Sequence, residues 1–153
     1  MSSKTKESHF SLVLETPAAE PERARQHFLS RLEFESDIAD LALDLQRGQN
    51  NFTIIDTRSP KSYEECHIPG AINLPKINEQ TTAELPKDKV CIVYCWGPAC
   101  NGSIKGAMKL AGLGFRVKEL TGGMEYWRKE NCPVEGTLGE EAQMYWQLER
   151  SNW

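Results

Sequence analysis

The fold of this chain is decided by VCIVYCWGPACNGSIKGAMKLAGLGF, residues 90–115. Its opening run, Val90 to Tyr94, is almost entirely apolar and β-prone, which is typical of a strand buried on both faces. After a glycine-containing loop, apolar residues recur at helical spacing between Ser103 and Leu113. These residues are Ile104, Ala107, Met108 and Ala111. A strand, a helix and a further candidate strand at Arg116 to Leu120 predict a parallel sheet with a right-handed crossover.

Further helices and a strand are predicted on either side of this unit. The clearest helix begins after Ser36 or Asp37, either of which can cap it, and ends at Gly48, which suits a helix C-terminus. The other helices are predicted over about 18–31, 123–130 and 140–150. A short strand is predicted from Phe52 to Ile55.

The chain is expected to divide into a tail, one domain and an extension. Residues 1–17 are expected to form a flexible N-terminal tail. Residues 18–135 are expected to form a single domain with an N-terminal helix, because 153 residues suit one ordinary core. Residues 136–153 are expected to form a C-terminal helical extension. Its aromatic residues, Tyr145, Trp146 and Trp153, suit either core packing or a partner surface.

Charge and hydropathy exclude several classes of partner. The net charge is -4 and the basic residues are scattered, so we expect no nucleic-acid or membrane-surface binding. No apolar run approaches the roughly 20 residues that span a bilayer. The apolar run Phe10 to Leu14 is too short for the core of a signal peptide, so we expect a cytoplasmic protein.

The five cysteines are predicted to be reduced thiols. Their number is odd, no CxxC pair occurs, and the three histidines are too dispersed to complete a zinc site. We therefore expect no metal and no cofactor. Cys66 and Cys91, the latter inside a predicted strand, are predicted to be inert.

Cys95 is the candidate nucleophile, because it lies at the carboxyl end of a predicted parallel strand, where ligands bind in open α/β sheets. A buried strand-end cysteine is, as a class, more often a small core residue. The loop after it favours reactivity: Gly97 and Gly102 permit unusual backbone angles, Pro98 stiffens the turn, and Ser103 can cap the following helix. Such a cradle of amides is expected to lower the pKa of the thiol from about 8.5 towards neutrality.

Several separate motifs in this chain resemble those of the rhodanese homology domain, over roughly residues 36–134. The matching stretches are Asp56-Thr57-Arg58-Ser59 with Tyr63, His67-Ile68-Pro69-Gly70-Ala71-Ile72-Asn73-Leu74-Pro75, Tyr94-Cys95, Gly122-Gly123-Met124-Glu125-Tyr126-Trp127 and Pro133-Val134. The resemblance implies an α/β fold with a doubly wound parallel β-sheet flanked by α-helices on both faces. Within it, His67 and the pair Asp56 and Arg58 are expected to be structural.

The resemblance also implies a sulfurtransferase reaction through a persulfide on Cys95. The sulfur donor would be thiosulfate or a persulfide, and the acceptor cyanide or a thiol, including a protein thiol. The loop that would bind the anionic substrate consists of Trp96, Gly97, Pro98, Ala99, Cys100, Asn101, Gly102 and Ser103. Lys105 either assists in attracting the donor or is an ordinary exposed helix lysine.

Two positions in the loop depart from related families. Rhodanese-like enzymes typically carry an arginine where this chain has Cys100, and the related phosphatases need one where it has Asn101, so phosphatase activity is not expected. Cys100 is either a thiol that resolves a Cys95 persulfide as a disulfide or a loop residue without chemistry. Two alternatives to a sulfurtransferase therefore stay open: a non-catalytic binding or regulatory module, and a Cys95/Cys100 redox sensor.

Overall fold

The computed structural model describes residues 9–148 of the chain. They divide between two compact units, one that ends at Arg31 and one that begins at Leu32. The first contains most of helix α1 (Pro21–Phe34), where an ion pair of 2.7 Å joins Glu22 and Arg25 in the opening turns. This helix begins three residues later than the predicted start at 18, at a proline suited to a first helical position.

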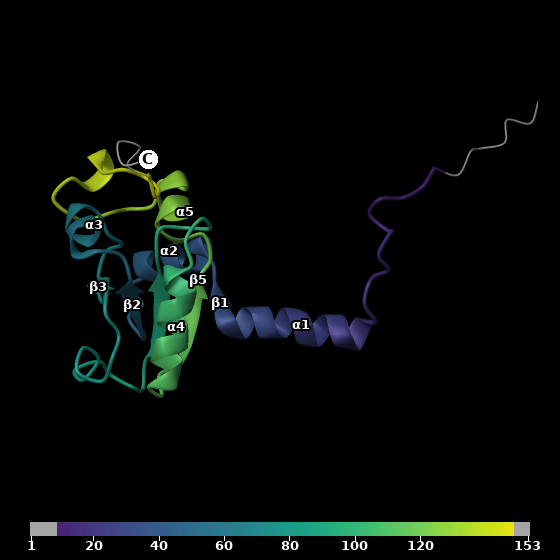
Figure 1. Cartoon of the computed structure of the whole chain (residues 1–153), viewed down its shortest axis with the longest axis horizontal. Coiled ribbons are helices and arrows are strands. Elements are labelled where there is room, and N and C mark those ends of the chain that lie inside the picture. The colour runs from purple at the N-terminus through teal and green to yellow at the C-terminus, as the bar shows by residue number, and fades with distance from the viewer. Residues whose placement is uncertain (1–8, 149–153) are drawn as a thin grey trace, which may run out of the picture. The chain divides into compact units, whose positions relative to one another are not determined.

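The second unit is an α/β structure built on one five-stranded sheet, in which every pair of neighbouring strands is parallel. The elements in chain order are β1 (Glu35–Ser36), α2 (Ile38–Gln46), β2 (Phe52–Asp56), α3 (Pro60–Glu65), β3 (Ile72–Asn73), β4 (Val90–Tyr94), α4 (Gly102–Gly112), β5 (Val117–Leu120), α5 (Gly123–Lys129) and the 3₁₀ helix η1 (Gly139–Glu141). The strand order is β1-β5-β4-β2-β3, so β4 lies in the middle. Figure 1 shows α4 crossing in front of the sheet.

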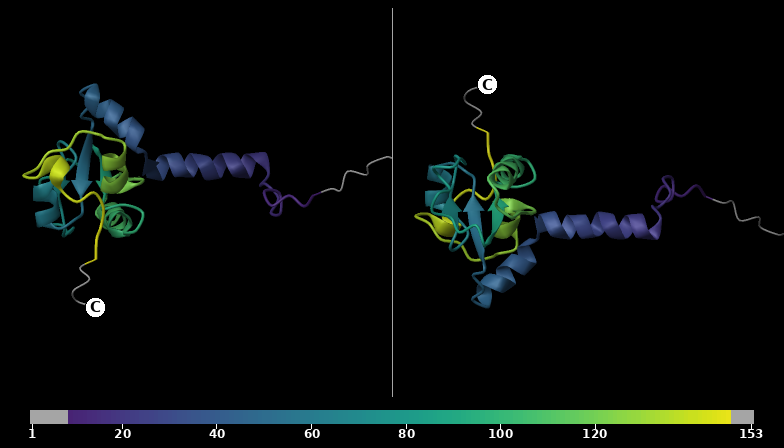
Figure 2. Two further views of the ribbon diagram at one scale, coloured as in Figure 1. Left: turned by 90° about the horizontal axis from the view of Figure 1, so that it is seen from above. Right: turned by 90° about the horizontal axis from the view of Figure 1, so that it is seen from below.

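Helices cover both faces of the sheet, which confirms the predicted fold class. Along β4 the side chains alternate: Cys91 and Val93 pack with Leu110 of α4, whereas Ile92 and Tyr94 pack into the opposite core with residues of α2 and α5. This alternation is the two-residue period of a strand buried on both faces. The two views in Figure 2 agree in placing α2 and α4 on opposite sides of the sheet.

The buried face of α4 differs from the predicted one. Ile104 and Met108 are 59% and 66% exposed, while Ser103, Gly106 and Leu110 face the sheet. A Cβ at Gly106 would lie 2.8 Å from Cγ2 of Thr57. The helix therefore approaches the sheet through small residues such as Gly106. A search for regularly spaced large apolar side chains does not identify this face.

The predicted C-terminal helix over 140–150 is wrong for the part that the structure describes. Only η1 forms, and residues 142–148 are not helical. The buried Arg128 guanidinium donates to the carbonyl oxygens of Glu140 at 2.7 Å and Ala142 at 3.2 Å, which a continuing helix would need as acceptors. Tyr145 and Trp146 stay about half exposed, at 46% and 50%, and Trp153 lies outside the described residues.

Candidate active site

Cys95 directly follows the central strand β4, and its side chain is only 6% exposed. The start of α5 holds the backbone of Cys95 and of the residue after it. The Met124 amide donates to the Cys95 carbonyl at 3.0 Å, and the Glu125 amide donates to the Trp96 carbonyl at 2.8 Å. At Gly123, where φ is +56°, a Cβ would lie 2.6 Å from the Cys95 carbonyl oxygen. Glycine at this position therefore permits α5 to lie against the reactive segment.

The loop brings a second thiol against the first. The Sγ atoms of Cys95 and Cys100 lie 2.7 Å apart, and both cysteines are free. The Gly102 amide donates to Cys100 Sγ at 3.3 Å. A Cβ at Gly102 would lie 2.7 Å from Cys95 Sγ and 3.4 Å from Cys100 Sγ. The missing side chain of Gly102 is thus what leaves room for the two sulfur atoms.

The electrostatic surroundings raise the pKa of Cys95 to about 11. Burial is the largest cause, and the hydrogen bond with Cys100 is the next; the Trp96 amide and the Thr57 hydroxyl oppose them by stabilising the thiolate. The expectation that the loop lowers this pKa is wrong, because desolvation outweighs the amides. At neutral pH, Cys95 is therefore a protonated thiol.

This raised pKa predicts a steep pH dependence for the alkylation of Cys95 by iodoacetamide. Since only the thiolate reacts, we expect the rate to increase about tenfold per pH unit from about pH 7 to about pH 10. Replacing Cys100→Ala removes a neighbour that raises the pKa, so alkylation at neutral pH should become faster. Peptide mass spectrometry measures both rates, with Cys132→Ala as the control. A wild-type rate that levels off near pH 8 would contradict this pKa.

The loop is packed at Trp96 and Gly97 and open at the two residues that follow them. The Arg58 guanidinium lies over the Trp96 ring at 4.6 Å, and a Cβ at Gly97 would lie 2.9 Å from a carboxylate oxygen of Glu125. Pro98 and Ala99 are exposed. The Cys100 amide donates to the Gly97 carbonyl at 3.0 Å, which closes the turn. That amide is consequently occupied within the loop itself.

The residues at the start of α4 do not take the predicted positions. Asn101 occupies the N-cap position, without a side-chain capping bond, whereas Ser103 is buried and donates to Glu119 at 3.0 Å. The prediction that Ser103 caps this helix is therefore wrong, because the N-cap lies two residues earlier. Lys105 is exposed in the first turn, and its amide donates to the Asn101 carbonyl at 3.1 Å.

A cavity of about 460 Å³ opens beside the loop. It is lined by Pro98, Ala99, Cys100, Asn101, Ile104 and Trp146. Cys100 thus faces this cavity and also contacts the buried Cys95. The sequence did not predict Trp146 at this cavity. The segment that carries Trp146 is not helical, and it is far from the Cys95 loop in sequence.

A buried polar network lies next to the site. Arg58 pairs with Asp56 at 2.8 Å, and the Tyr94 hydroxyl donates to the same carboxylate at 2.8 Å. Thr57 donates to the Tyr94 carbonyl at 2.9 Å and also contacts Cys95. It belongs to one of the matching motifs, but no role was predicted for it. His67 stacks on Tyr63 and hydrogen-bonds its carbonyl at 2.7 Å. These contacts agree with the structural roles predicted for Asp56, Arg58 and His67.

Comparison with known proteins identifies the family. A family model described as the rhodanese-like domain matches residues 38–130. The chain belongs to the rhodanese-like domain family. It is 35% identical over 82 residues to the thiosulfate sulfurtransferase GlpE of Coxiella burnetii, across 52% of this chain and 75% of that protein. In structure it is similar to the BH2092 protein of Bacillus halodurans, with a TM-score of 0.84, 52% identity, and coverage of 87% and 98% of the two chains.

Other relatives of this rhodanese-like domain are longer proteins. The HTH-type transcriptional regulator Rv0324 of Mycobacterium tuberculosis is 34% identical over 91 residues, which is 59% of this chain and 40% of the regulator. The chain spans only 25% and 21% of two further relatives, a probable molybdopterin-synthase adenylyltransferase of Porphyra purpurea and the probable adenylyltransferase/sulfurtransferase MoeZ of Mycobacterium tuberculosis. The family therefore includes sulfurtransferases and segments of larger proteins.

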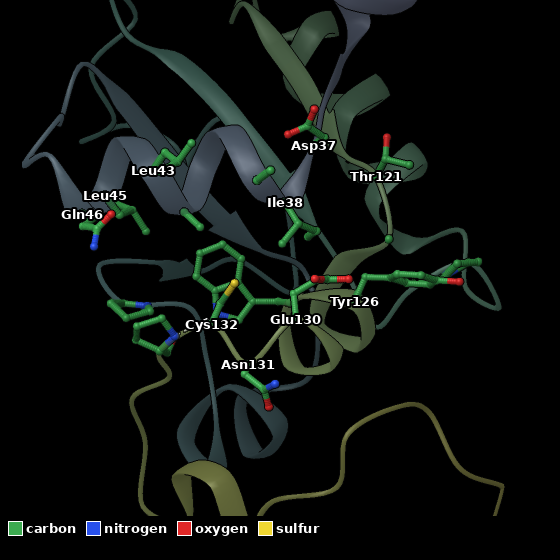
Figure 3. Close-up of a pocket in the computed structure, with 17 residues that line it drawn as sticks. Asp37, Ile38, Leu43, Leu45, Gln46, Thr121, Tyr126, Glu130, Asn131 and Cys132 are labelled. Carbon is green, nitrogen blue, oxygen red and sulfur yellow. Dashed lines mark hydrogen bonds between the residues drawn. The ribbon is translucent and has the colours of Figure 1, made fainter.

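The rhodanese-like domain also has a larger cavity, of about 1110 Å³, between α2 and α5. Figure 3 shows Ile38 and Leu45 on one side of it and Tyr126 and Cys132 on the other. Its lining includes Pro98 but not Cys95 or Cys100, so this cavity is separate from the thiol pair. Size alone does not assign it a role.

Two other features bear on ligands and membranes. Among residues 9–148, no three His, Cys, Asp or Glu side chains are grouped as metal ligands would be. No helix in this part of the rhodanese-like domain protein has the length and apolar character needed to span a membrane.

Proposed function

We propose that this protein is a sulfurtransferase in which Cys95 accepts a sulfane sulfur from a donor such as thiosulfate and carries it as a persulfide. The observation that carries the proposal is the position of Cys95 at the carboxyl end of β4, held by α5 and facing the start of α4. Relatives named as sulfurtransferases support this reaction class. A cytoplasmic thiol or cyanide is the proposed acceptor.

The loading step follows from thiol chemistry. The Cys95 thiol loses its proton to solvent, and the thiolate attacks the outer sulfur of thiosulfate. A new sulfur–sulfur bond forms on Cys95 while the bond within thiosulfate breaks, and sulfite leaves with the electron pair. The Trp96 amide, which stabilises the thiolate, is placed to stabilise the persulfide anion as well. Because the pKa of Cys95 is about 11, loading is expected to be slow at neutral pH.

Loading is tested by incubating the reduced protein with thiosulfate and measuring sulfite. We expect Cys95→Ser to release at least about a hundredfold less sulfite than wild type, since no thiolate remains at the attacking position. Cys132→Ser, which removes a half-buried thiol in the cavity between α2 and α5, is the matched control and should behave as wild type. Full sulfite release by Cys95→Ser would refute the proposal.

Two observations favour other functions, which sulfite release together with iodoacetamide and peroxide treatment separates. The relationship to the regulator Rv0324 favours a binding module, for which no sulfite is expected although iodoacetamide still modifies Cys95. The 2.7 Å contact between Cys95 and Cys100 favours a redox sensor, for which mild peroxide should form a reversible disulfide while thiosulfate does not react. Burial and the raised pKa of Cys95 argue against rapid reaction with peroxide.

A further inference from the structure

Cys100 differs from Cys95 in its access to solvent, although their sulfur atoms touch. Cys95 is buried, whereas Cys100 is half-buried and lines the cavity beside the loop. The Sγ–Sγ distance of 2.7 Å is shorter than the about 3–3.5 Å that separates reacting atoms in near-attack geometries. An external thiol must first reach the buried site, but Cys100 is already there. Its effective concentration towards Cys95 is therefore far above that of any free thiol.

The surrounding backbone keeps the two thiols in this relation. The Cys100 amide is bonded to the Gly97 carbonyl, and Cys100 Sγ accepts from the Gly102 amide at 3.3 Å. These two bonds fix the position of the Cys100 sulfur, the atom that attacks in thiol–disulfide exchange. The loop thus holds Cys100 as an attacking group beside the atom that would carry the persulfide.

We propose that Cys100 is the resolving thiol of this site and converts the Cys95 persulfide into a Cys95–Cys100 disulfide with release of sulfide. The inference rests on the proposed sulfurtransferase function and names the acceptor as a thiol within the same chain. It also gives a chemical role to the cysteine that stands where related enzymes carry an arginine.

Atoms and electrons balance in this step. The Cys100 thiol gives up its proton, which passes through solvent to the outer sulfur of the persulfide anion, and the Cys100 sulfur attacks Cys95 Sγ. The bond from that atom to the outer sulfur breaks, and the outer sulfur leaves as hydrosulfide with the electron pair. The sulfane sulfur is thereby reduced by two electrons, and the two cysteines are oxidised from thiols to a disulfide. A dithiol reductant, itself oxidised to a disulfide, returns the protein to its starting state.

The choice of sulfur atom follows from the leaving groups. Attack on the outer sulfur would expel the Cys95 thiolate, whereas attack on the inner sulfur expels hydrosulfide. A thiol with a lower pKa leaves faster, and burial raises the pKa of Cys95 to about 11. Hydrosulfide is therefore the better leaving group, so we expect a disulfide and not a relay of persulfide to Cys100.

A single-turnover experiment on the full chain tests this step. The protein is reduced, freed of reductant and mixed with thiosulfate, and sulfite, sulfide and intact mass without reductant are followed together. Wild type should release about one sulfide per sulfite and lose two hydrogen atoms. Cys100→Ser should release sulfite but at least about tenfold less sulfide, and should gain one sulfur atom on the Cys95 peptide. Once thiosulfate is removed, added dithiol should release sulfide from the persulfide of Cys100→Ser, whereas it should reduce the wild-type disulfide without releasing sulfide.

Controls separate this inference from the proposed function. Cys132→Ser should match wild type, and Cys100→Ala repeats the test with a residue that cannot accept a hydrogen bond from Cys95. If wild type releases sulfite but keeps a stable persulfide on Cys95, the resolving role is wrong and the sulfurtransferase proposal stands. If neither wild type nor the Cys100 variants release sulfite, both proposals are wrong.

Discussion

Replacing Asp56→Ala is expected to lower the free energy of unfolding by about 3–5 kcal/mol, because the partner charge stays buried without compensation. Asp56 is 0% exposed and Arg58 is 3% exposed, and their charged groups lie 2.8 Å apart. The carboxylate also accepts from the Tyr94 hydroxyl and from the Arg58 backbone amide, both at 2.8 Å. The substitution therefore leaves several buried donors without an acceptor.

Urea unfolding of wild type and Asp56→Ala measures this loss. The matched control is Lys61→Ala, which removes a much more exposed pair with Glu65 at 3.9 Å. Exposed pairs contribute about 0–1 kcal/mol, so the control should unfold nearly as wild type does. A loss below 1 kcal/mol for Asp56→Ala would show that water or rearranged side chains satisfy Arg58.

The centre of the sheet could be predicted because its sequence signals are strong. Val90 to Tyr94 is β4 with the predicted bounds, and Asp37 caps α2 by accepting from the Asp40 amide at 2.7 Å. The short apolar, β-prone run is typical of a strand covered on both faces, and the cap is a local interaction between residues close in sequence. Such signals do not depend on the rest of the fold.

The short elements were not predicted, because tertiary contacts define them. β1 and β3 each contain two residues, and they are strands only because β5 and β2 lie beside them. Helix α3 has a capping serine, Ser59, and a proline at its first position, but at six residues it shows no full hydrophobic period. The segment after η1 likewise depends on a distant residue, Arg128.

The candidate site was predicted in composition but not in geometry. The spacing of Cys95 and Cys100 indicated that their sulfurs are able to meet, but it contained no information on the burial that raises the pKa of Cys95. The role of Ser103 was wrong because its partner, Glu119, comes from β5. Burial and long-range partners are properties of the folded chain, and no local pattern encodes them.

Replacing Gly102→Ala is expected to slow sulfite release from thiosulfate by about a hundredfold. The new Cβ would lie 2.7 Å from Cys95 Sγ and 3.3 Å from Cys95 Cβ, and the buried thiol has to move to accommodate it. A misplacement of about 1 Å at a reacting atom costs on the order of a hundredfold in rate. The same displacement separates Cys95 from Cys100, so sulfide release should fall together with sulfite release.

The matched control is Gly112→Ala on the same helix, where an added Cβ meets nothing within 4 Å. Alanine favours a helix over glycine by about 1 kcal/mol, so this variant should be at least as stable as wild type and equally active. In Gly102→Ala the same gain in helix propensity is offset by the clash with Cys95. We therefore expect its unfolding midpoint to stay near that of wild type while its rate of sulfite release falls. Wild-type rates in Gly102→Ala would mean that the two sulfur atoms do not occupy this space during loading.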